Sequence, residues 1–500
     1  MLAGTRAKGL RRGDVLLMPV PGGGYGACQV TANDSELLLV HALDWWSAEP
    51  PVLADLAGAQ PLRLDHHSHS GGLDQVNISV EVPIPAGFRL LGNQDVGADI
   101  PNSSNTHSRW RALAGDVSYQ RAWDLELPAA AKAGYKSAAT KGPVDVDFGV
   151  GAVTIGGATR ALDLASGDPV AVPDADAGPV RWEALDRLPG CTRLFWRGPD
   201  RGLTAALARY PSISGLTWRD APEQTDLSGS WLNQLELVGK MPQRLRLPAR
   251  MRHLSLVAGT DLTVDAADNG RWMRLHLETD SADFVMPQGL ERIQELLITG
   301  NGSLTAAPLA DLTELRELTL RWRRPPGELT EAHDLSALQH LHHVHFIDGY
   351  GVGADQIPDL PNLSYLEAFG LTRSSANEMK KRYHHTGVEV IVHGAKSDQW
   401  IRANLENPFR NWVDDHEKGG AAACKAYAKA LRAIESSPDR QLARETLKTL
   451  TGTLNKIDAK YELIDTLRRE EAWEAFAVLA SKANVGQDEA GDWFDEWRDF

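Results

Sequence analysis

The residue types that could hold a metal ion or act as acid–base groups gather in two histidine-rich segments. The first is DHHSH at 65–69. Neighbouring side chains on a strand point to opposite faces, so only His67 and His69 could share a metal ion. No cysteine or second carboxylate lies at a fixed spacing nearby. We therefore interpret this segment as a polar loop.

The second histidine-rich segment is HLHHVHF at 340–346. If Val344 and Phe346 face a core, His343 and His345 point together to the opposite face of the strand. One interpretation is a zinc pair. The interpretation we favour is a polar patch that faces a partner, where histidines would make binding sensitive to pH.

No complete catalytic motif is present. The glycine-rich run GGGYG at 22–26 lacks the Lys-Ser/Thr ending of a phosphate loop, and we interpret it as a hairpin turn. Nucleophile-elbow, zinc-protease and EF-hand patterns are missing as well. The sequence thus predicts a non-enzyme without catalytic residues, cofactor or metal ion, although carboxylates that meet only in the fold could still catalyse a reaction.

Composition narrows the class of protein further. The chain has 52 basic and 67 acidic residues, a net charge of −15, and 42% hydrophobic residues. Such an acidic chain is a poor binder of nucleic acid. Its apolar runs are far shorter than the ~20 residues of a membrane span, and the N-terminus lacks an apolar signal segment. The three cysteines are widely spaced, which fits a reducing compartment, so we expect a cytoplasmic protein.

An internal repeat indicates how these residues are positioned. Apolar L-x-L pairs recur at intervals of 19 to 26 residues, and each pair alternates as a short strand does. One turn of this kind cannot bury its apolar face alone, so neighbouring turns must stack into a solenoid. We predict parallel strands in one sheet at 194–196, 216–218, 235–237, 254–256, 275–277, 296–298, 318–320, 344–346 and 366–368.

The repeats resemble the bacterial leucine-rich-repeat family over residues 180–395, most clearly from Leu290 to Ala368. The resemblance implies a curved solenoid whose strands line a concave face. Before it, residues 142–179 would form the first cap of the solenoid and a linker. Within that cap we predict a hairpin between the segments 152–155 and 158–164.

Residues 1–141 form a β-rich module by pattern, with strands at VLLMPV, YGACQV and SELLLVHALDWW. GDVLLMPVPGGGYGACQV resembles the opening of the immunity protein 26 family of bacterial toxin–immunity systems, and VPIPAGFRLLGNQ at 82–94 is similar to a later stretch of that family. Five residues carry the likeness: Asp14, Pro19, Gly24, Tyr25 and Val30. The resemblance implies a module that neutralises a toxin by binding it, without chemistry of its own.

Helical patterns dominate residues 396–500, including an alanine-rich stretch at 421–434. We predict helix starts at Asp398 and at Ser437-Pro438-Asp439. NPFRNW at 407–412 and the run from Leu454 to Phe476 resemble the helical tail that follows the repeats in some uncharacterised bacterial leucine-rich-repeat proteins. The acidic, aromatic end of this domain carries Trp493 and Trp497, which we expect to pack on their own domain rather than to contact a partner.

Together these patterns predict an α+β multi-domain protein: a β-rich immunity-like module (1–141), a cap and linker (142–179), a leucine-rich-repeat solenoid (180–395) and a helical domain (396–500). The concave strand face is the expected binding surface, because arginine and aromatic residues dominate interface energies. The expected partner-binding residues are Arg193, Arg197, Arg219, Arg274, His276, Arg321, Trp322, Arg323, His343, His345 and Tyr365.

Three functions fit these expectations. The first is non-enzymatic recognition of a protein, such as a toxin, by an immunity-type protein, with no nucleic acid and no membrane involved. The second is a general repeat scaffold in signalling or motility, in which the first module is a structural cap. The third is an enzyme whose site lies in residues 1–140. A toxin gene beside this one would favour the first function.

Overall fold

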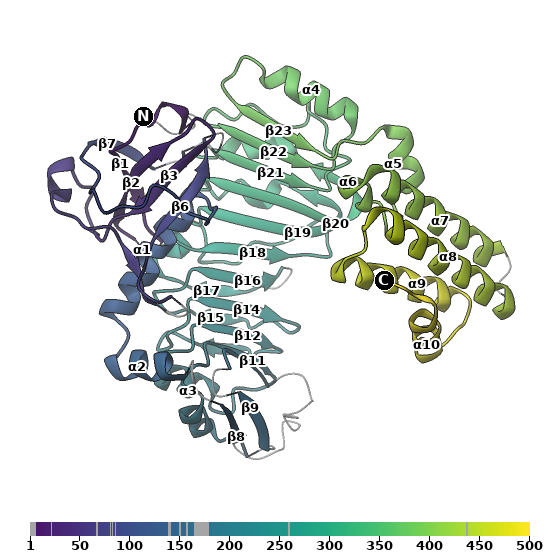
Figure 1. The fold of residues 1–500 in the computed structure, drawn as a ribbon, viewed down its shortest axis with the longest axis horizontal. Coiled ribbons are helices and arrows are strands. Elements are labelled where there is room, and N and C mark those ends of the chain that lie inside the picture. Colours follow the sequence, from purple (N-terminus) through teal and green to yellow (C-terminus); the bar gives the residue numbers. More distant parts are fainter. Residues whose placement is uncertain are drawn as a thin grey trace.

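The computed structural model describes residues 7–500 except 22, 67–68, 81, 83, 86, 139–141, 150–151, 157–158, 165–179, 259–260 and 437–438. The fold is α+β, and its largest element is a parallel sheet (Figure 1). An antiparallel sheet with two helices precedes this sheet, and a group of helices follows it. No helix in the described ranges is long and apolar enough to cross a membrane.

The chain begins with an antiparallel five-stranded sheet in the order β6-β3-β2-β1-β7. Its strands are β1 (Asp14–Pro19), β2 (Tyr25–Asn33), β3 (Leu37–Ala42), β6 (Gln75–Ser79) and β7 (Arg89–Asn93). The three strands expected in this region are confirmed. The turn between β1 and β2 needs glycine, because Gly24 has φ 85° and a Cβ there would lie 2.6 Å from the Trp46 ring. Smaller elements complete this part: η1 (Ala7–Gly9), η2 (Leu53–Leu56), β4 (Arg63–Leu64) and β5 (Gly72–Leu73).

Two helices follow that the sequence did not predict, α1 (Trp110–Leu125) and α2 (Ala129–Ala138). The apolar side of α1, with Leu113 and Val117, packs on the antiparallel sheet against residues such as Met18. Ser118 and Gln120 of the same helix are also buried. Because α1 is covered on more than one side, its sequence has no clean apolar stripe to reveal it.

The large sheet has the order β10-β11-β12-β14-β16-β18-β19-β20-β21-β22-β23, and every neighbouring pair is parallel. The nine predicted strands are confirmed. The strands are β10 (Ala161–Asp163), β11 (Arg193–Arg197), β12 (Gly215–Arg219), β14 (Gln234–Val238), β16 (His253–Val257), β18 (Arg274–Glu278), β19 (Glu295–Thr305), β20 (Glu317–Thr330), β21 (His343–Ile347), β22 (Tyr365–Phe369) and β23 (Glu389–His393).

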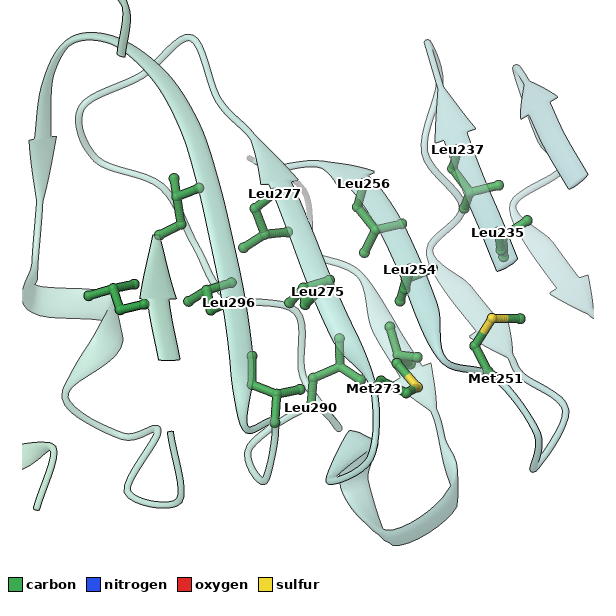
Figure 2. Packing of buried hydrophobic residues seen from close by; sticks show 14 of the residues in the cluster. Leu235, Leu237, Met251, Leu254, Leu256, Met273, Leu275, Leu277, Leu290 and Leu296 are labelled. Carbon is green, nitrogen blue, oxygen red and sulfur yellow. The ribbon is translucent and has the colours of Figure 1, made fainter. Parts of the chain in front are cut away.

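The core of this region lies along one face of the large sheet. Leucines at equivalent positions stack in rows from strand to strand, as Leu254 and Leu256 do beside Leu275 and Leu277 (Figure 2). Shorter elements close the core from behind: η3 (Trp182–Arg187), α3 (Leu203–Arg209), β13 (Gln224–Asp226), β15 (Arg244–Arg246), β17 (Thr263–Asp265), η4 (Ala267–Gly270), η5 (Ala307–Leu309), η6 (Ala332–Ala337) and α4 (Arg373–Tyr383).

The hairpin predicted within 142–179 is wrong in its pairing. The strand β9 (Ala152–Gly156) pairs with β8 (Pro143–Asp147), whereas β10 joins the large sheet beside β11. The physical reason is burial: Leu162 in β10 is 4% exposed and extends the same leucine row as Leu194. Residues 157–158, in the expected turn, and 165–179 lie outside the described residues.

The C-terminal helices form a core of their own, in which Trp493 and Trp497 stack 5.6 Å apart, so their predicted packing on their own domain is confirmed. Two predicted helix starts shift: Ser397 caps α5, and Asp439 itself caps α8, while 437–438 lie outside the described residues. The helices are α5 (Asp398–Asn404), α6 (Trp412–Asp415), α7 (Glu417–Ser436), α8 (Arg440–Tyr461), α9 (Thr466–Lys482) and α10 (Gln487–Trp497).

Candidate functional site

Alternation along each strand divides the large sheet into a core side and a side facing away from the core, which we call the strand face. In β21, Val344 and Phe346 are 0% exposed, while His343 and His345 lie on the strand face as expected. The same alternation places ten of the expected partner-binding residues there: Arg193, Arg197, Arg219, Arg274, His276, Arg321, Arg323, His343, His345 and Tyr365.

Trp322 is the exception, and its assignment to the binding surface is corrected. Its side chain is 0% exposed and lies in the core, with its ring 6.3 Å from that of Phe346. Trp322 lies two residues after Leu320 in β20, so it points to the same buried side of the strand as Leu318 and Leu320. It therefore fills the sheet's interior, and only its neighbours Arg321 and Arg323 are exposed.

The N-terminal part covers the strand face where the strands begin (Figure 1). Arg111 of α1 forms ion pairs with Glu295 and, at 2.6 Å, with Glu317, the first residues of β19 and β20. Further along the sheet, Arg252 lies 4.6 Å from the Tyr119 ring of α1. These contacts remove the beginnings of the strands from the surface that a partner could reach.

The ion pairs of Arg111 have different effects on their two carboxylates. Burial raises the pKa of Glu295, although Arg111 opposes this effect. Burial acts in the same direction on Glu317, but Arg111 and His343 outweigh it, and the pKa of Glu317 falls. The arginine therefore holds Glu317 in its charged form and ties α1 to the sheet.

The strand face remains open where the strands end. We call this surface the open half and define it by the outward-facing residues near the strand ends: Arg197, Arg219, Val238, Val257, Glu278, Arg321, Arg323, Ile347, Phe369 and His393. The C-terminal helices border it, since Arg410 lies 3.5 Å from Asp348, directly after β21. The open half thus lies between the N-terminal part and the C-terminal helices (Figure 1).

Four exposed arginines give the open half its positive charge. Arg323 pairs with Glu278 at 2.5 Å, and Arg197 approaches Asp220 at 3.8 Å. Arg219 and Arg321 form no ion pair with any residue in the described part of the chain. Arg197 and Arg219 are direct neighbours across β11 and β12, so their like charges lie side by side.

The remaining expected residues have partners within the sheet. The ring nitrogens of His276 contact the hydroxyls of Ser255 and Thr299, at 3.3 and 2.9 Å. Arg274 is 3.8 Å from Glu295. Arg193 lies 5.6 Å from the Phe195 ring. These side chains therefore help to order the strand face.

Aromatic and histidine rings gather at the end of the open half on β21, β22 and β23. The Phe369 ring stacks on His393 at 4.4 Å and lies 5.4 Å from His345, and Phe369 is 39% exposed. Glu367 lies between the two histidines, 4.0 Å from His345 and 3.3 Å from His393. Burial lowers the pKa of His345 to about 4, so this ring is neutral at pH 7.

Among the described residues, the histidine-rich segments contribute to no cluster that could hold a metal ion. His343 and His345 stack with their ring centroids 6.4 Å apart. Nowhere in the described ranges do three or more His, Cys, Asp or Glu residues come together as metal ligands. In the first segment, His66 is buried and packs 4.6 Å from the His69 ring, while His67 lies outside the described residues.

Some residues of the site were missed by sequence reasoning. Phe369 and His393 occupy the next outward positions of strands that were predicted, so the same alternation could have found them. Arg111 had no such signal. It lies 184 residues from Glu295 in a helix that the pattern did not reveal.

Comparison with known proteins adds no assignment. No protein-family model matches the chain, and the search of curated proteins finds no significant match.

Proposed function

We propose that the large sheet and the shorter elements behind it form a leucine-rich-repeat solenoid. Strand recurrence every 19 to 26 residues, parallel pairing in sequence order and stacked leucine rows all support this assignment. A solenoid offers a rigid array of side chains, and rigid arrays lose little entropy when they bind. The assignment therefore suits a recognition protein.

We further propose that the protein is a non-enzymatic, cytoplasmic recognition protein of the immunity type, whose open half binds an acidic surface of another protein, such as a toxin. The observation that carries this proposal is the pair Arg219 and Arg321, which are exposed and unpaired among the described residues of a chain with net charge −15. An acidic partner would supply the missing counter-charges. Phe369 adds an aromatic anchor of the kind found in binding hot spots.

One observation favours the general scaffold as a second candidate. The N-terminal part is held on the strand face by Arg111 and covers the beginnings of the strands. In a signalling or motility scaffold, this part would serve as a structural cover, and its own surface would bind no toxin. The likeness of residues 14–30 to an immunity family is then a likeness of fold alone.

A charge-reversal experiment tests the proposed function. The double variant Arg219→Glu with Arg321→Glu should weaken binding to the partner, identified first as a toxin encoded by a neighbouring gene, by at least about a hundredfold, since like charges across an interface cost several kcal/mol. Protection of cells from the toxin should be lost in parallel. The free energy of unfolding should stay within about 1 kcal/mol of the wild-type value, because both side chains are exposed.

The matched control is Arg187→Glu with Arg402→Glu, which changes the net charge equally at exposed positions away from the strand face. It should bind as the wild-type protein does. Equal loss in both variants would reduce the effect to net charge and contradict a specific site. Unchanged binding in the strand-face variant would also contradict the proposal.

A further inference from the structure

A cavity of about 160 Å³ remains where the N-terminal part meets the strand face. Its walls come from both sides of this junction. Arg109 and Trp110, at the start of α1, face Arg316, His343 and Tyr365, which lie just before or at the beginning of strands of the large sheet. The cavity is therefore complete only while the two parts are docked.

A buried hydrogen-bond donor at this cavity lacks an acceptor among the described residues. Trp110 is 0% exposed, and its indole N–H, which can only donate, has no acceptor in the described part of the chain. Burial raises the pKa of Tyr365 to about 12, so its hydroxyl keeps its proton at pH 7.

The charged side chains at the cavity also favour a negatively charged ligand. Arg109 and Arg316 form no ion pair with any described residue, and burial together with the neighbouring Arg271 and Arg111 lowers the pKa of Arg316. Two carboxylates also line the cavity: Glu317 shares Arg111 with Glu295, and Glu367 lies near His345 and His393. Three arginines, Arg109, Arg111 and Arg316, thus line the cavity beside two glutamates, which leaves an excess of one positive charge.

The N-terminus of α1 lies at the cavity and strengthens this preference for negative charge. α1 has 16 residues, no side chain caps its N-terminus and its first turn contains no acidic residue. The free N–H groups and the positive end of the helix dipole at such a terminus favour an anion. Arg109 is the N-cap residue, so its guanidinium is attached at the same end.

We propose that this cavity binds a small oxyanion, a phosphate or a carboxylate, between Arg109 at the start of α1 and Arg316 of the sheet. The anion would accept hydrogen bonds from the guanidinium groups, which are strong because both partners are charged. The volume of the cavity suits an inorganic ion or a small metabolite rather than a nucleotide. Because both sides of the junction contribute, the bound anion would also hold the N-terminal part on the strand face. This inference does not depend on the protein partner proposed above.

Isothermal titration of the full-length protein with inorganic phosphate and with malonate, at constant ionic strength set by chloride, tests the proposal. At least one of the two should bind, and which one binds better identifies the source of the oxyanion. The same ligand should raise the melting temperature, because it binds only the folded, docked state. Absence of binding by both ligands would overturn the proposal.

Two variants locate the site. Arg109→Gln changes an exposed residue and should weaken binding at least about tenfold, while the folded structure is unaffected. Arg316→Gln should do the same. The matched control, Arg402→Gln, removes an exposed arginine of α5 and should leave binding unchanged. If Arg109→Gln binds as tightly as the wild-type protein, the anion lies elsewhere and the proposal is wrong.

Discussion

At the scale of single residues, one position along a strand separates a core side chain from a candidate binding residue. Trp322 and Arg321 are neighbours, yet the first is 0% exposed and the second is exposed without an ion pair among the described residues. The sequence predicted the register of β20 correctly, but the assignment of Trp322 to the binding surface was wrong. Near the end of a strand, the sequence alone does not show whether a large side chain such as Trp322 packs in the core or lies on the surface.

A buried carboxyl group in the N-terminal part makes stability depend on pH. Asp74 is 3% exposed, and burial, followed by the nearby Asp116, raises its pKa to about 8. The folded state therefore binds a proton that the unfolded state releases between about pH 4 and pH 8. In this window the free energy of unfolding falls as pH rises.

Replacing this group should remove that dependence. Asp74→Asn imitates the protonated acid, so we expect it to be more stable than the wild-type protein at pH 8, by an amount on the order of 5 kcal/mol, with the gain shrinking toward zero at pH 4. Chemical denaturation at both pH values measures the difference. Asp311→Asn, at an exposed aspartate, is the control and should show no such trend. A variant less stable than the wild-type protein at pH 8 would mean that the ionised form of Asp74 is stabilising.

At the scale of elements, periodic apolar spacing predicted the strands of the large sheet, because each strand repeats the same burial. It did not predict α1, in which the polar side chains of Ser118 and Gln120 are buried together with apolar ones such as Leu113 and Val117. It also predicted the wrong partner for β9, because the alternating pattern of this strand allows pairing with either β8 or β10. Leu162 draws β10 into the large sheet, and β9 therefore pairs with β8. Apolar periodicity therefore predicts an element reliably when only one face of that element is buried.

The register of the large sheet can be tested at two adjacent positions. Leu318 is 1% exposed, so Leu318→Asp should lower the free energy of unfolding by about 3–5 kcal/mol by placing an unpaired charge in the core. Thr319 lies on the strand face, and Thr319→Asp should cost less than about 1 kcal/mol. Thermal and denaturant unfolding of the two variants give the comparison. Equal losses, or a larger loss for Thr319→Asp, would show that the register is shifted by one residue.

At the scale of the whole molecule, contacts between distant segments decide which part of the strand face is available. The sequence indicated a strand face rich in arginine, but it carried no sign that α1 would cover the beginnings of its strands. That arrangement depends on Arg111 and on Glu295 and Glu317, about 200 residues away, a pairing that only the folded chain reveals. The open half is therefore narrower than the surface that the repeats alone predict.

Site-specific photo-crosslinking tests the central claim, that the open half is the surface that binds a protein partner. A crosslinking residue would be placed at Ile347 in the open half, at Val52 in the N-terminal part and at Leu442 on α8, where Val52 and Leu442 are 61% and 39% exposed. The purified partner should crosslink from Ile347 and fail to crosslink from the two controls. The Arg219→Glu, Arg321→Glu background should abolish the product. Crosslinking from Val52 without any from Ile347 would contradict the account and assign binding to the N-terminal part.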